Sequence, residues 1–506
     1  MIRAALLAGG LALAACGCGS AASGSSGSSP PPATATAVPS GDWPMFDFNP
    51  QRTGVGPAAT GITAGNLRTL RARRVHLDGT VDSSPIELHA LTVDGGRRDV
   101  IIVTTAYGRT IAIDAATGGR LWEFVPPGIH RLEGSSQITT ATPVADPGRR
   151  YVYAASPDGL IHKLSLATGG QVRSGGWPVR VTNDPAREKI PSALNLSGRE
   201  VIATTGGYVG DQPVYQGHVV TIDRASGRIV HVWNSLCADV HRLLVPRTCP
   251  ASGSAIWARA GAVVEPGSRR LLVSTGNADF HHASPFDGRR FWPDSVLELT
   301  PDAGRLLHNW TPRNQAQLSG SDTDLGSTAP ALLGHFGGRR LAVQGGKDGL
   351  LHLLDLGRLD GTTGPASART GGELQNISAP GGAQLLSAPT VWGHGGRTMV
   401  FVADGDGTAA YALSGDARPR LRQVAANGTP GTSPVLAGGL LYVYDHRDGT
   451  LEVYDPSTLH RLISLPAAVG HWNSPIVVGG RIVVPEGDDN HHSTRGILDI
   501  FHLPGR

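Results

Sequence analysis

One strand-rich pattern recurs along almost the whole chain, and it restricts the possible folds more than any other feature. Its clearest copy begins at Ser84-Pro85, continues through the runs Asp99–Thr105 and Gly108–Asp114, and ends at Trp122. Alternating apolar residues are typical of strands with one buried face, and the Thr117-Gly118 pair marks a turn. This copy therefore predicts a small sheet of four strands.

The same order of strands and turns recurs to the end of the chain. Successive copies start roughly 40 to 75 residues apart, the spacing expected of propeller blades that carry loop insertions. A four-stranded sheet cannot bury both faces alone, whereas radial packing against neighbouring sheets buries both and leaves only short edges. The sequence therefore predicts an all-β fold, an eight-bladed β-propeller of four-stranded antiparallel blades. The copies begin at Ser84, Thr142, Ser192, Ser254, Ala329, Ala388, Ser433 and Ser474.

The last copy lacks one strand. It stops after its third strand at Phe501-His502-Leu503, while the run Leu70–Leu77 near the start belongs to no copy. We expect Leu70–Leu77 to supply the missing strand, because this pairing leaves no open sheet edge and links the two ends of the folded region. The alternative is an open stack of sheets with a frayed last blade.

The N-terminal forty residues resemble a targeting segment followed by a tether. Residues 1–15 combine a positive charge with an apolar run too short to span a bilayer, which is typical of a signal peptide. The run ends at Leu13-Ala14-Ala15-Cys16, which resembles a bacterial lipobox and implies a lipid on Cys16. The composition of residues 16–40 favours a disordered tether. We therefore expect an exported lipoprotein on the extracytoplasmic face of a membrane, with the propeller over residues 41–506. The alternative is an ordinary signal peptide that leaves Cys16 idle.

Charge and cysteine content narrow the class of partner. The net charge is +3, and acidic and basic residues are mixed along the chain. This pattern does not indicate a basic surface for nucleic acid. Only Cys237 and Cys249 fall within the expected propeller, and in an oxidising compartment they are expected to form a disulfide. The alternative is a pair of buried free thiols.

The run Ala112–Trp122 resembles the tryptophan-docking motif of the pyrroloquinoline-quinone (PQQ) dehydrogenases and their non-enzymatic relatives. In that family the tryptophan packs between adjacent blades. The segment Asp42–Asp47, followed by Arg52-Thr53-Gly54, resembles the opening segment of the same propellers. The resemblance covers nearly the whole folded region and implies the fold more strongly than any activity, because members of this superfamily include outer-membrane assembly lipoproteins that bind no PQQ.

The resemblance also implies a set of cofactor residues. Trp257 stands where the family stacks a tryptophan on the quinone, and Asn277 where an asparagine binds calcium. Asp322 or Asp324 stands at the position of the family's catalytic base, and Asp324 is also an implied metal ligand. Lys347 stands at the position of the cation that contacts the quinone oxygens. Such a site would hold PQQ with calcium.

Two family features are missing. No glutamate stands near Gly206–Val209, where the family has its calcium-binding Glu, and the chain has no adjacent cysteine pair. Calcium usually takes about six to eight oxygen ligands, so an Asn and an Asp alone make a weak site. Each matching residue also has an alternative explanation without a cofactor. In this explanation, Trp257 packs between blades and Asn277 ends a strand in a turn, while the aspartates accept hydrogen bonds from backbone N–H groups and Lys347 is a solvated loop residue.

We therefore expect a binding or scaffold module in the cell envelope, with an envelope protein or a small molecule as its partner at the propeller axis. The alternative is a PQQ- and calcium-dependent alcohol or sugar dehydrogenase, and a third possibility is a lyase or sugar-binding propeller that shares only the architecture. Two histidine pairs, His281-His282 and His491-His492, follow acidic residues. Imidazole and carboxylate suit zinc or copper, but we expect both pairs to be solvated loop residues.

Overall fold

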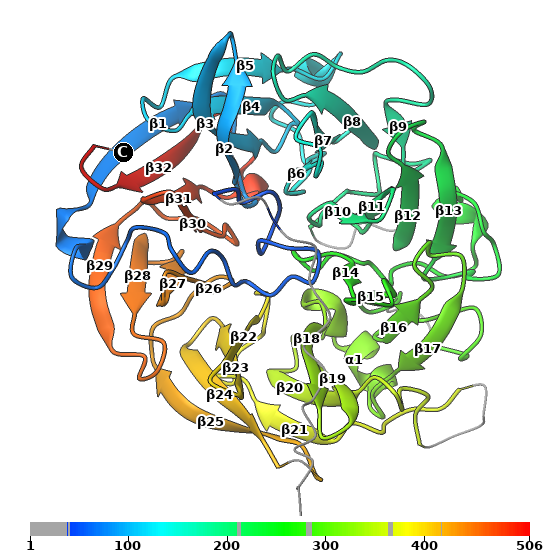
Figure 1. The fold of residues 1–506 in the computed structure, drawn as a ribbon. Helices are drawn as coiled ribbons and strands as arrows, with labels where there is room; N and C mark the ends of the chain where they lie inside the picture. Colours follow the sequence, from blue (N-terminus) through cyan, green and yellow to red (C-terminus); the bar gives the residue numbers. More distant parts are fainter. Residues whose placement is uncertain are drawn as a thin grey trace, which may run out of the picture. The chain divides into compact units, whose positions relative to one another are not determined.

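Eight four-stranded sheets surround a common axis in the computed structural model (Figure 1). The structure describes residue 38 and residues 41–209, 214–279, 286–362, 368–415 and 417–505. Cys16, the predicted signal peptide, nearly all of the predicted tether and the His281-His282 pair lie outside these residues. The predicted all-β, eight-bladed propeller is confirmed.

Each blade contains four antiparallel strands that follow one another in the sheet, and the first strand lies nearest the axis (Figure 1). Blades 1 to 4 contain β2 (Ile86–Val93), β3 (Gly96–Thr104), β4 (Thr110–Asp114) and β5 (Arg120–Phe124); β6 (Val144–Ala145), β7 (Tyr151–Ser156), β8 (Leu160–Ser165) and β9 (Val179–Arg180); β10 (Asn195–Ser197), β11 (Glu200–Thr204), β12 (His218–Asp223) and β13 (Ile229–Asn234); and β14 (Val263–Val264), β15 (Leu271–Ser274), β16 (Val296–Leu299) and β17 (Leu306–Trp310). Blades 5 to 8 contain β18 (Ala331–Phe336), β19 (Arg339–Gly345), β20 (Leu350–Asp355) and β21 (Gln375–Ser378); β22 (Thr390–His394), β23 (Arg397–Ala403), β24 (Thr408–Ser414) and β25 (Arg420–Asn427); β26 (Val435–Ala437), β27 (Leu440–Asp445), β28 (Thr450–Tyr454) and β29 (Arg461–Pro466); and β30 (Ile476–Val478), β31 (Arg481–Glu486) and β32 (Gly496–His502), completed by β1 (Arg71–Leu77).

The last blade is closed by the N-terminal strand, as predicted. Strand β1 pairs antiparallel with β32 in a register that runs from Arg71 opposite His502 to Leu77 opposite Gly496. Arg74 adds a two-pronged ion pair across this junction, with 2.9 Å and 2.6 Å between its guanidinium nitrogens and the Asp499 carboxylate. The first and last strands of the described chain therefore meet in one sheet, which completes the eighth blade.

A buried ion cluster joins the last blade to the first. The Arg481 guanidinium on β31 lies 2.5 Å from a carboxylate oxygen of Glu87 on β2 and 2.5 Å from one of Asp99 on β3. Arg481 is 3% exposed and Glu87 is 1% exposed, so water competes little for these contacts. The closure thus combines a strand pairing with a charged clamp between blades.

Trp122 at the end of blade 1 packs against the next blade. Its indole Nε1 donates to the carbonyl of Leu166 at 2.9 Å. A Cβ at Gly169, which has φ near +68°, would lie 2.6 Å from the indole, so only glycine fits at that turn. The tryptophan-docking motif therefore has the inter-blade contact that the resemblance implied.

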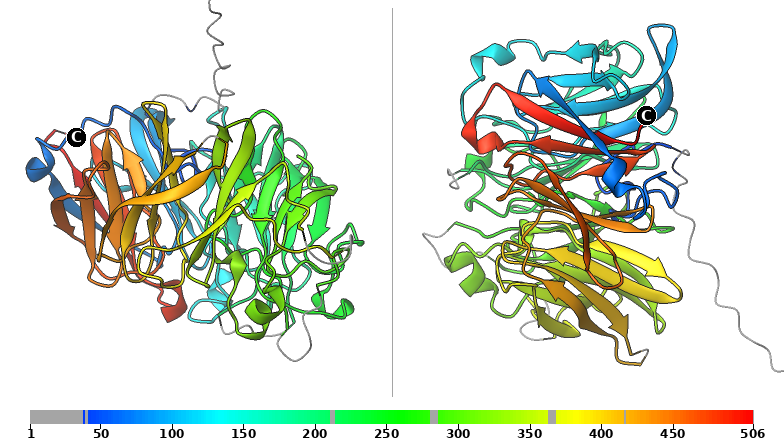
Figure 2. Two further views of the ribbon diagram at one scale, coloured as in Figure 1. Left: turned by 90° about the horizontal axis from the view of Figure 1, so that it is seen from below. Right: turned by 90° about the vertical axis from the view of Figure 1, so that its left-hand side faces the viewer.

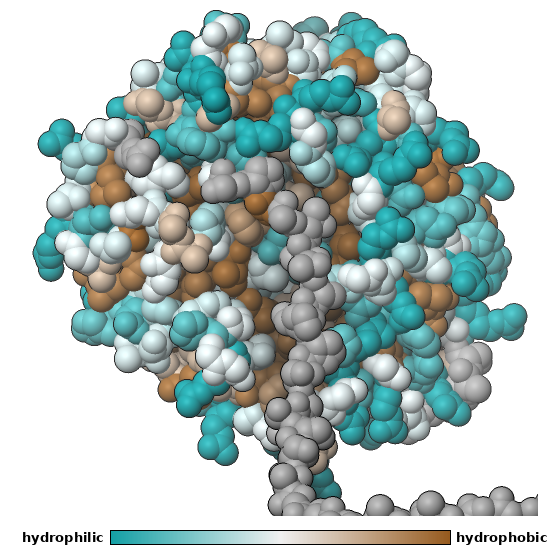
Figure 3. Space-filling view, in the orientation of Figure 1, coloured by the Kyte–Doolittle hydropathy of each residue, from teal (hydrophilic) through white to brown (hydrophobic). Residues whose placement is uncertain are grey.

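The segment before β1 crosses one end of the channel. Its backbone bonds to several inner strands: Trp43 to Glu87, Thr53 to Val391, and Gly54 to Leu436. The side chain of Arg52, 2% exposed, donates to the carbonyls of Ala260, Phe46 and Leu194. Figure 1 shows this dark blue segment over the centre of the ring, and Figure 3 shows mostly hydrophilic residues at the rim of that face and apolar residues nearer its centre. The opposite end of the channel is therefore the end at which we look for a ligand site.

Helical segments are few among the described residues. The α-helix is α1 (Gln315–Gly320), and the short 3-10 turns are η1 (Leu67–Thr69), η2 (Ile129–Arg131), η3 (Pro246–Thr248), η4 (Leu325–Ser327) and η5 (Asp489–His491). In Figure 2, α1 and η5 lie at the end of the propeller opposite the dark blue segment. No helix in the described part of the chain is long and apolar enough to cross a membrane.

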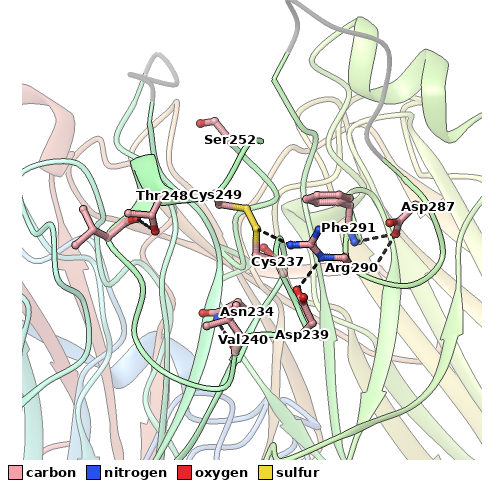
Figure 4. The surroundings of a disulfide bond; sticks show 12 residues. Asn234, Cys237, Asp239, Val240, Thr248, Cys249, Ser252, Asp287, Arg290 and Phe291 are labelled. Atoms are coloured by element: carbon pink, nitrogen blue, oxygen red, sulfur yellow. Dashed lines mark hydrogen bonds and ion pairs between the residues drawn. A yellow bond between two sulfur atoms is a disulfide. The ribbon is translucent and has the colours of Figure 1, made fainter.

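Cys237 and Cys249 form a disulfide with an S–S distance of 2.05 Å. The bond closes a loop between β13 and β14 (Figure 4). Arg290 reaches the same loop, since its Nε donates to Asp239 Oδ1 at 2.8 Å. The bond closes part of the connection between blades 3 and 4.

Seven of the eight predicted starting points lie two or three residues before the first strand of their blade, as Ser84 does before Ile86. Ser254 is the exception, because β14 begins nine residues later, from 254 to 263. That starting point was placed too early. The residues between carry Trp257 and Arg259 and line the axis instead of forming an inner strand.

Candidate binding site at the propeller axis

A cavity of about 410 Å³ lies where the segments leading into the inner strands meet. Two of the residues implied by the resemblance, Trp257 and Lys347, line it together with both candidate bases, Asp322 and Asp324. These four residues come from three different inter-strand connections in blades 3 to 5. The fold therefore brings together side chains that lie up to ninety residues apart, from 257 to 347.

Lys347 sits at the centre of this group. Its Nζ lies 2.5 Å from Asp324 Oδ2 and 3.1 Å from Asp322 Oδ1. The same Nζ lies 5.6 Å from the centre of the Trp257 ring, within the range of a cation–π contact. Burial alone would lower the pKa of Lys347, but the two aspartates raise it, so the ammonium stays charged. Lys347 is thus a fixed cation in the cavity wall.

The two aspartates differ in position. The side chain of Asp324 is 5% exposed, and its Oδ1 accepts a hydrogen bond from the backbone N of Asn277 at 2.9 Å. Asp322 is 53% exposed and has φ near +53°. A Cβ at Gly276 would collide with Asp324 Oδ1, so the glycine before Asn277 permits this close approach. Asp324 therefore lies in the wall of the cavity and Asp322 at its rim.

A second buried carboxyl lies behind Asp324. Asp294 accepts hydrogen bonds from Ser319 Oγ at 2.7 Å and from the backbone N of Leu325 at 3.1 Å. Burial, and then repulsion from Asp324, raise the pKa of Asp294 to about 8. Asp294 is therefore mostly protonated at neutral pH. Helix α1, which no sequence pattern predicted, positions Ser319 for this contact.

The other wall of the cavity is aromatic and basic. Trp472, from the connection into blade 8, has its ring centre 5.8 Å from that of Trp257 at an angle of 36°. The Arg259 guanidinium lies 4.9 Å from the Trp472 ring and 2.9 Å from Asp82 Oδ1. A flat ligand stacked between two aromatic rings needs about 7 Å between the planes of those rings. The indoles of Trp257 and Trp472 contact each other instead, so a flat ligand must lie against one of them.

Lys189 completes the basic side. It is 9% exposed and lines the cavity, and its charge interacts with those of Asp489, Asp82 and Asp488. Burial and the nearby Arg259 charge lower the pKa of Lys189 to about 8. Its backbone pairs with Gly206, one of the residues near which the family has its calcium-binding glutamate. The Lys189 cation thus lies beside the position at which the family resemblance implies a glutamate carboxylate.

These residues do not fit a calcium ion. Of the two implied ligands, Asp324 already holds Lys347 Nζ on one oxygen and the Asn277 backbone on the other. Asp294 is mostly neutral, and Lys189 and Lys347 bring positive charge to the same cavity. Calcium needs several oxygens, including anionic ones, and the described residues around Asn277 do not supply them.

Sequence reasoning missed Lys189, Arg259, Trp472 and Asp82, although a signal was present. Asp82, Lys189 and Trp472 each lie two or three residues before a predicted starting point, at Ser84, Ser192 and Ser474. The connections that lead into the inner strands supply most of the residues that line the axial cavity. This rule would have selected these three.

The comparisons with known proteins agree with this fold. Residues 74–235 match the family described as outer membrane protein assembly factor BamB. The quinohemoprotein alcohol dehydrogenase ADH IIB of Pseudomonas putida is 26% identical over 320 residues, which cover 58% of this chain and 43% of that protein. The quinohemoprotein alcohol dehydrogenase of Comamonas testosteroni is 25% identical over 325 residues, which cover 58% and 42%. The aligned region spans less than half the length of these relatives.

Solved structures show the same architecture. The quinohemoprotein alcohol dehydrogenase from Comamonas testosteroni superposes with a TM-score of 0.65 at 16% identity, over 92% of this chain and 81% of that one. A europium-containing methanol dehydrogenase superposes with a TM-score of 0.63 at 15% identity, over 92% and 98%. At these identities the likeness shows the fold alone.

Fold and cavity together define a β-propeller with a cavity at one end of its axis. The sequence matches support a PQQ-binding-like propeller, similar over parts of its length to quinohemoprotein alcohol dehydrogenases and to the BamB family.

Proposed function

We propose that this chain is an exported binding module whose axial pocket takes a small, flat ring compound that carries a carboxylate, of which PQQ is the type example. One observation carries the proposal: Trp257, Lys347 and Lys189 converge on one cavity of about 410 Å³. An indole face stacks on a flat ring, and the ammonium groups pair with carboxylate or quinone oxygens. Pockets of this size are typical of small-molecule sites.

The axial partner in this proposal is a small molecule rather than an envelope protein. The polar groups line a half-open cavity instead of a flat face, and the opposite end of the channel is crossed by the segment that contains Arg52. An envelope protein that binds elsewhere on the propeller is compatible with this role.

The second candidate function is a PQQ- and calcium-dependent alcohol or sugar dehydrogenase. It is favoured by the convergence of Trp257, Asp324 and Lys347, the residues that the resemblance implied, and by the similarity to quinohemoprotein alcohol dehydrogenases. It ranks second because the pocket places Lys189 beside the expected calcium site and leaves Asp324 paired with Lys347.

Calorimetry with PQQ distinguishes these candidates. We expect the full chain in EDTA to bind PQQ with micromolar affinity, and Trp257→Ala to abolish the binding. Trp392→Ala is the matched control, because that partly buried tryptophan stacks on His394 in blade 6 and does not line the cavity. Binding without dye-linked oxidation of alcohols or sugars, even with added calcium, supports the module. Turnover with calcium would support the dehydrogenase, and absence of binding would refute both.

The proposed location rests on the N-terminal motif and on the disulfide. A lipid on Cys16 would anchor the module to the extracytoplasmic face of a membrane, and the Cys237–Cys249 bond suits an oxidising compartment. We expect Cys16→Ala to move the protein from the membrane fraction to the soluble fraction. Unchanged membrane retention of this variant would count against the lipid anchor.

A further inference from the structure

A second group of polar side chains lies where blade 8 meets blade 1. Asp82, His471 and Asp488 each offer a donor atom, and these atoms all lie within 4.8 Å of one another. The Nδ1 of His471 is 2.6 Å from Asp82 Oδ2 and 3.4 Å from Asp488 Oδ1. The three residues come from the connections before β2, before β30 and after β31. They lie on other blades than Asn277 and Asp324.

Neighbouring groups hold the three side chains in place. Asp82 Oδ1 accepts from Arg259 Nη2 at 2.9 Å and from the backbone N of Trp472 at 3.2 Å, which directs Oδ2 toward His471. The His471 ring stacks on the Trp472 ring, with centres 3.9 Å apart. Oriented imidazole and carboxylate donors of this kind are a common feature of metal sites.

Asp489 gives a second, independent indication of a ligand. It is 1% exposed, and neither of its carboxylate oxygens has a hydrogen-bond partner among the described residues. Its backbone N donates to Asp82 Oδ2 at 3.4 Å, and its charge interacts with those of Asp82 and Asp488 and with the cations Lys189 and Arg259, so Asp489 lies beside the same group. A buried polar group without a partner is costly, and such groups in folded proteins usually bind an ion or a water.

His446 adds a nitrogen donor to the same region. Its Nδ1 is buried without a hydrogen-bond partner among the described residues, and its ring interacts electrostatically with His471, Asp82 and Asp488. Asp489 and His446 thus lie near the group formed by Asp82, His471 and Asp488. Arg259, the ion-pair partner of Asp82, and Lys189 are the neighbouring cations.

We propose that Asp82, His471 and Asp488 bind a divalent transition-metal cation of the zinc class, beside the buried carboxyl of Asp489. Mixed imidazole and carboxylate donors suit Zn²⁺, whereas Ca²⁺ and Mg²⁺ prefer oxygen alone. The cation would bridge the closing blade and the first blade, and so stabilise the ring at its junction.

Calorimetric titration of Zn²⁺ into chelator-treated full chain tests this site, with Co²⁺ absorption in the visible range as a second readout. We expect one Zn²⁺ per chain with micromolar or tighter affinity, and a rise in Tm because the ion binds only the folded state. His471→Gln and Asp488→Asn should each weaken binding at least tenfold. Both residues are partly exposed, so both variants should fold, and circular dichroism checks this. His460→Gln, an exposed histidine in blade 7, is the control and should bind as the wild type does.

Two results would overturn the site. The first is the absence of a saturable 1:1 phase. The second is unchanged affinity in folded His471→Gln, which would assign the zinc to other histidines. Either result would leave His471 as a hydrogen-bonded link between Asp82 and Asp488.

Discussion

Lys347 Nζ lies 2.5 Å from Asp324 Oδ2, and this ion pair joins the connection into blade 5 with a turn of that blade in the wall of the axial cavity. The pair gives the cavity a charged lysine beside the Trp257 face, and at the same time it takes up the carboxylate oxygen that a metal would need. The pocket is therefore better suited to an anionic ring than to a calcium ion.

Replacing Lys347 tests its part in binding. Lys347→Met should weaken PQQ binding at least about tenfold, a loss of about 1.4 kcal/mol, because the cation is lost and Asp324 is left unpaired beside the ligand. Lys347→Arg should retain more affinity because it keeps the charge. Tryptophan fluorescence quenching by PQQ gives the affinities.

Lys163→Met is the matched control for that experiment. The Nζ of Lys163 also lies over aromatic rings, 4.3 Å from the centre of Tyr151, but it belongs to blade 2 and does not line the axial cavity. Equal losses in the Lys163 and Lys347 variants would argue against a direct role for Lys347.

The charged clamp at the ring closure should matter strongly for stability. Arg481→Met leaves Glu87 and Asp99 without their cation, and breaking a buried ion pair by removing one partner costs about 3 to 5 kcal/mol. Urea unfolding of the variant measures the loss. The double variant Arg481→Met/Glu87→Gln should recover part of it, since one buried charge is removed, and a double variant less stable than the single one would contradict this view.

The disulfide should stabilise the loop between blades 3 and 4. The bond joins residues twelve positions apart, and the chain-entropy model gives about 3 kcal/mol for a loop of that length. We expect Cys237→Ala/Cys249→Ala to lower the free energy of unfolding by up to that amount. Thiol titration of the denatured, non-reduced wild type should find neither of these two cysteines free, and finding both free would refute the bond.

Asp294 should make stability depend on pH. Its pKa rises from 3.8 to about 8 on folding, so the folded protein keeps a proton that the unfolded chain releases between these values. The resulting stabilisation is complete below pH 4 and is lost as the pH rises through about 8. Urea unfolding at pH 5 and pH 8 should show that the wild type loses at least about 1 kcal/mol more than Asp294→Asn does over this interval. An identical loss in both proteins would mean that Asp294 is not the group responsible.

Much of the fold could be predicted because its signals are local and repeated. The pattern around Trp122 gave the blade, its recurrence gave the number of blades, and the unmatched run Leu70–Leu77 gave the closing strand. The starting point Ser254 failed because a long connection precedes β14, and no local rule distinguishes that connection from a strand.

The site was predicted only in part, for a physical reason. Trp257 and Lys347 belong to motifs that can be recognised one at a time. The contacts of Trp472 with Trp257, and of Asp82 with Arg259, depend on ring closure, which brings residues from both halves of the chain to one axis. The protonation of Asp294 depends on burial by α1, which had no signal of its own.

The affinity for PQQ with and without calcium tests the central claim most directly. Two titrations of the same full-chain preparation, one in EDTA and one in excess calcium chloride, should give micromolar dissociation constants that agree within about threefold, because the pocket binds the ring through Trp257, Lys347 and Lys189 and holds no calcium. An affinity more than tenfold tighter in calcium would contradict the account and would show that the metal site of the dehydrogenases persists in this chain.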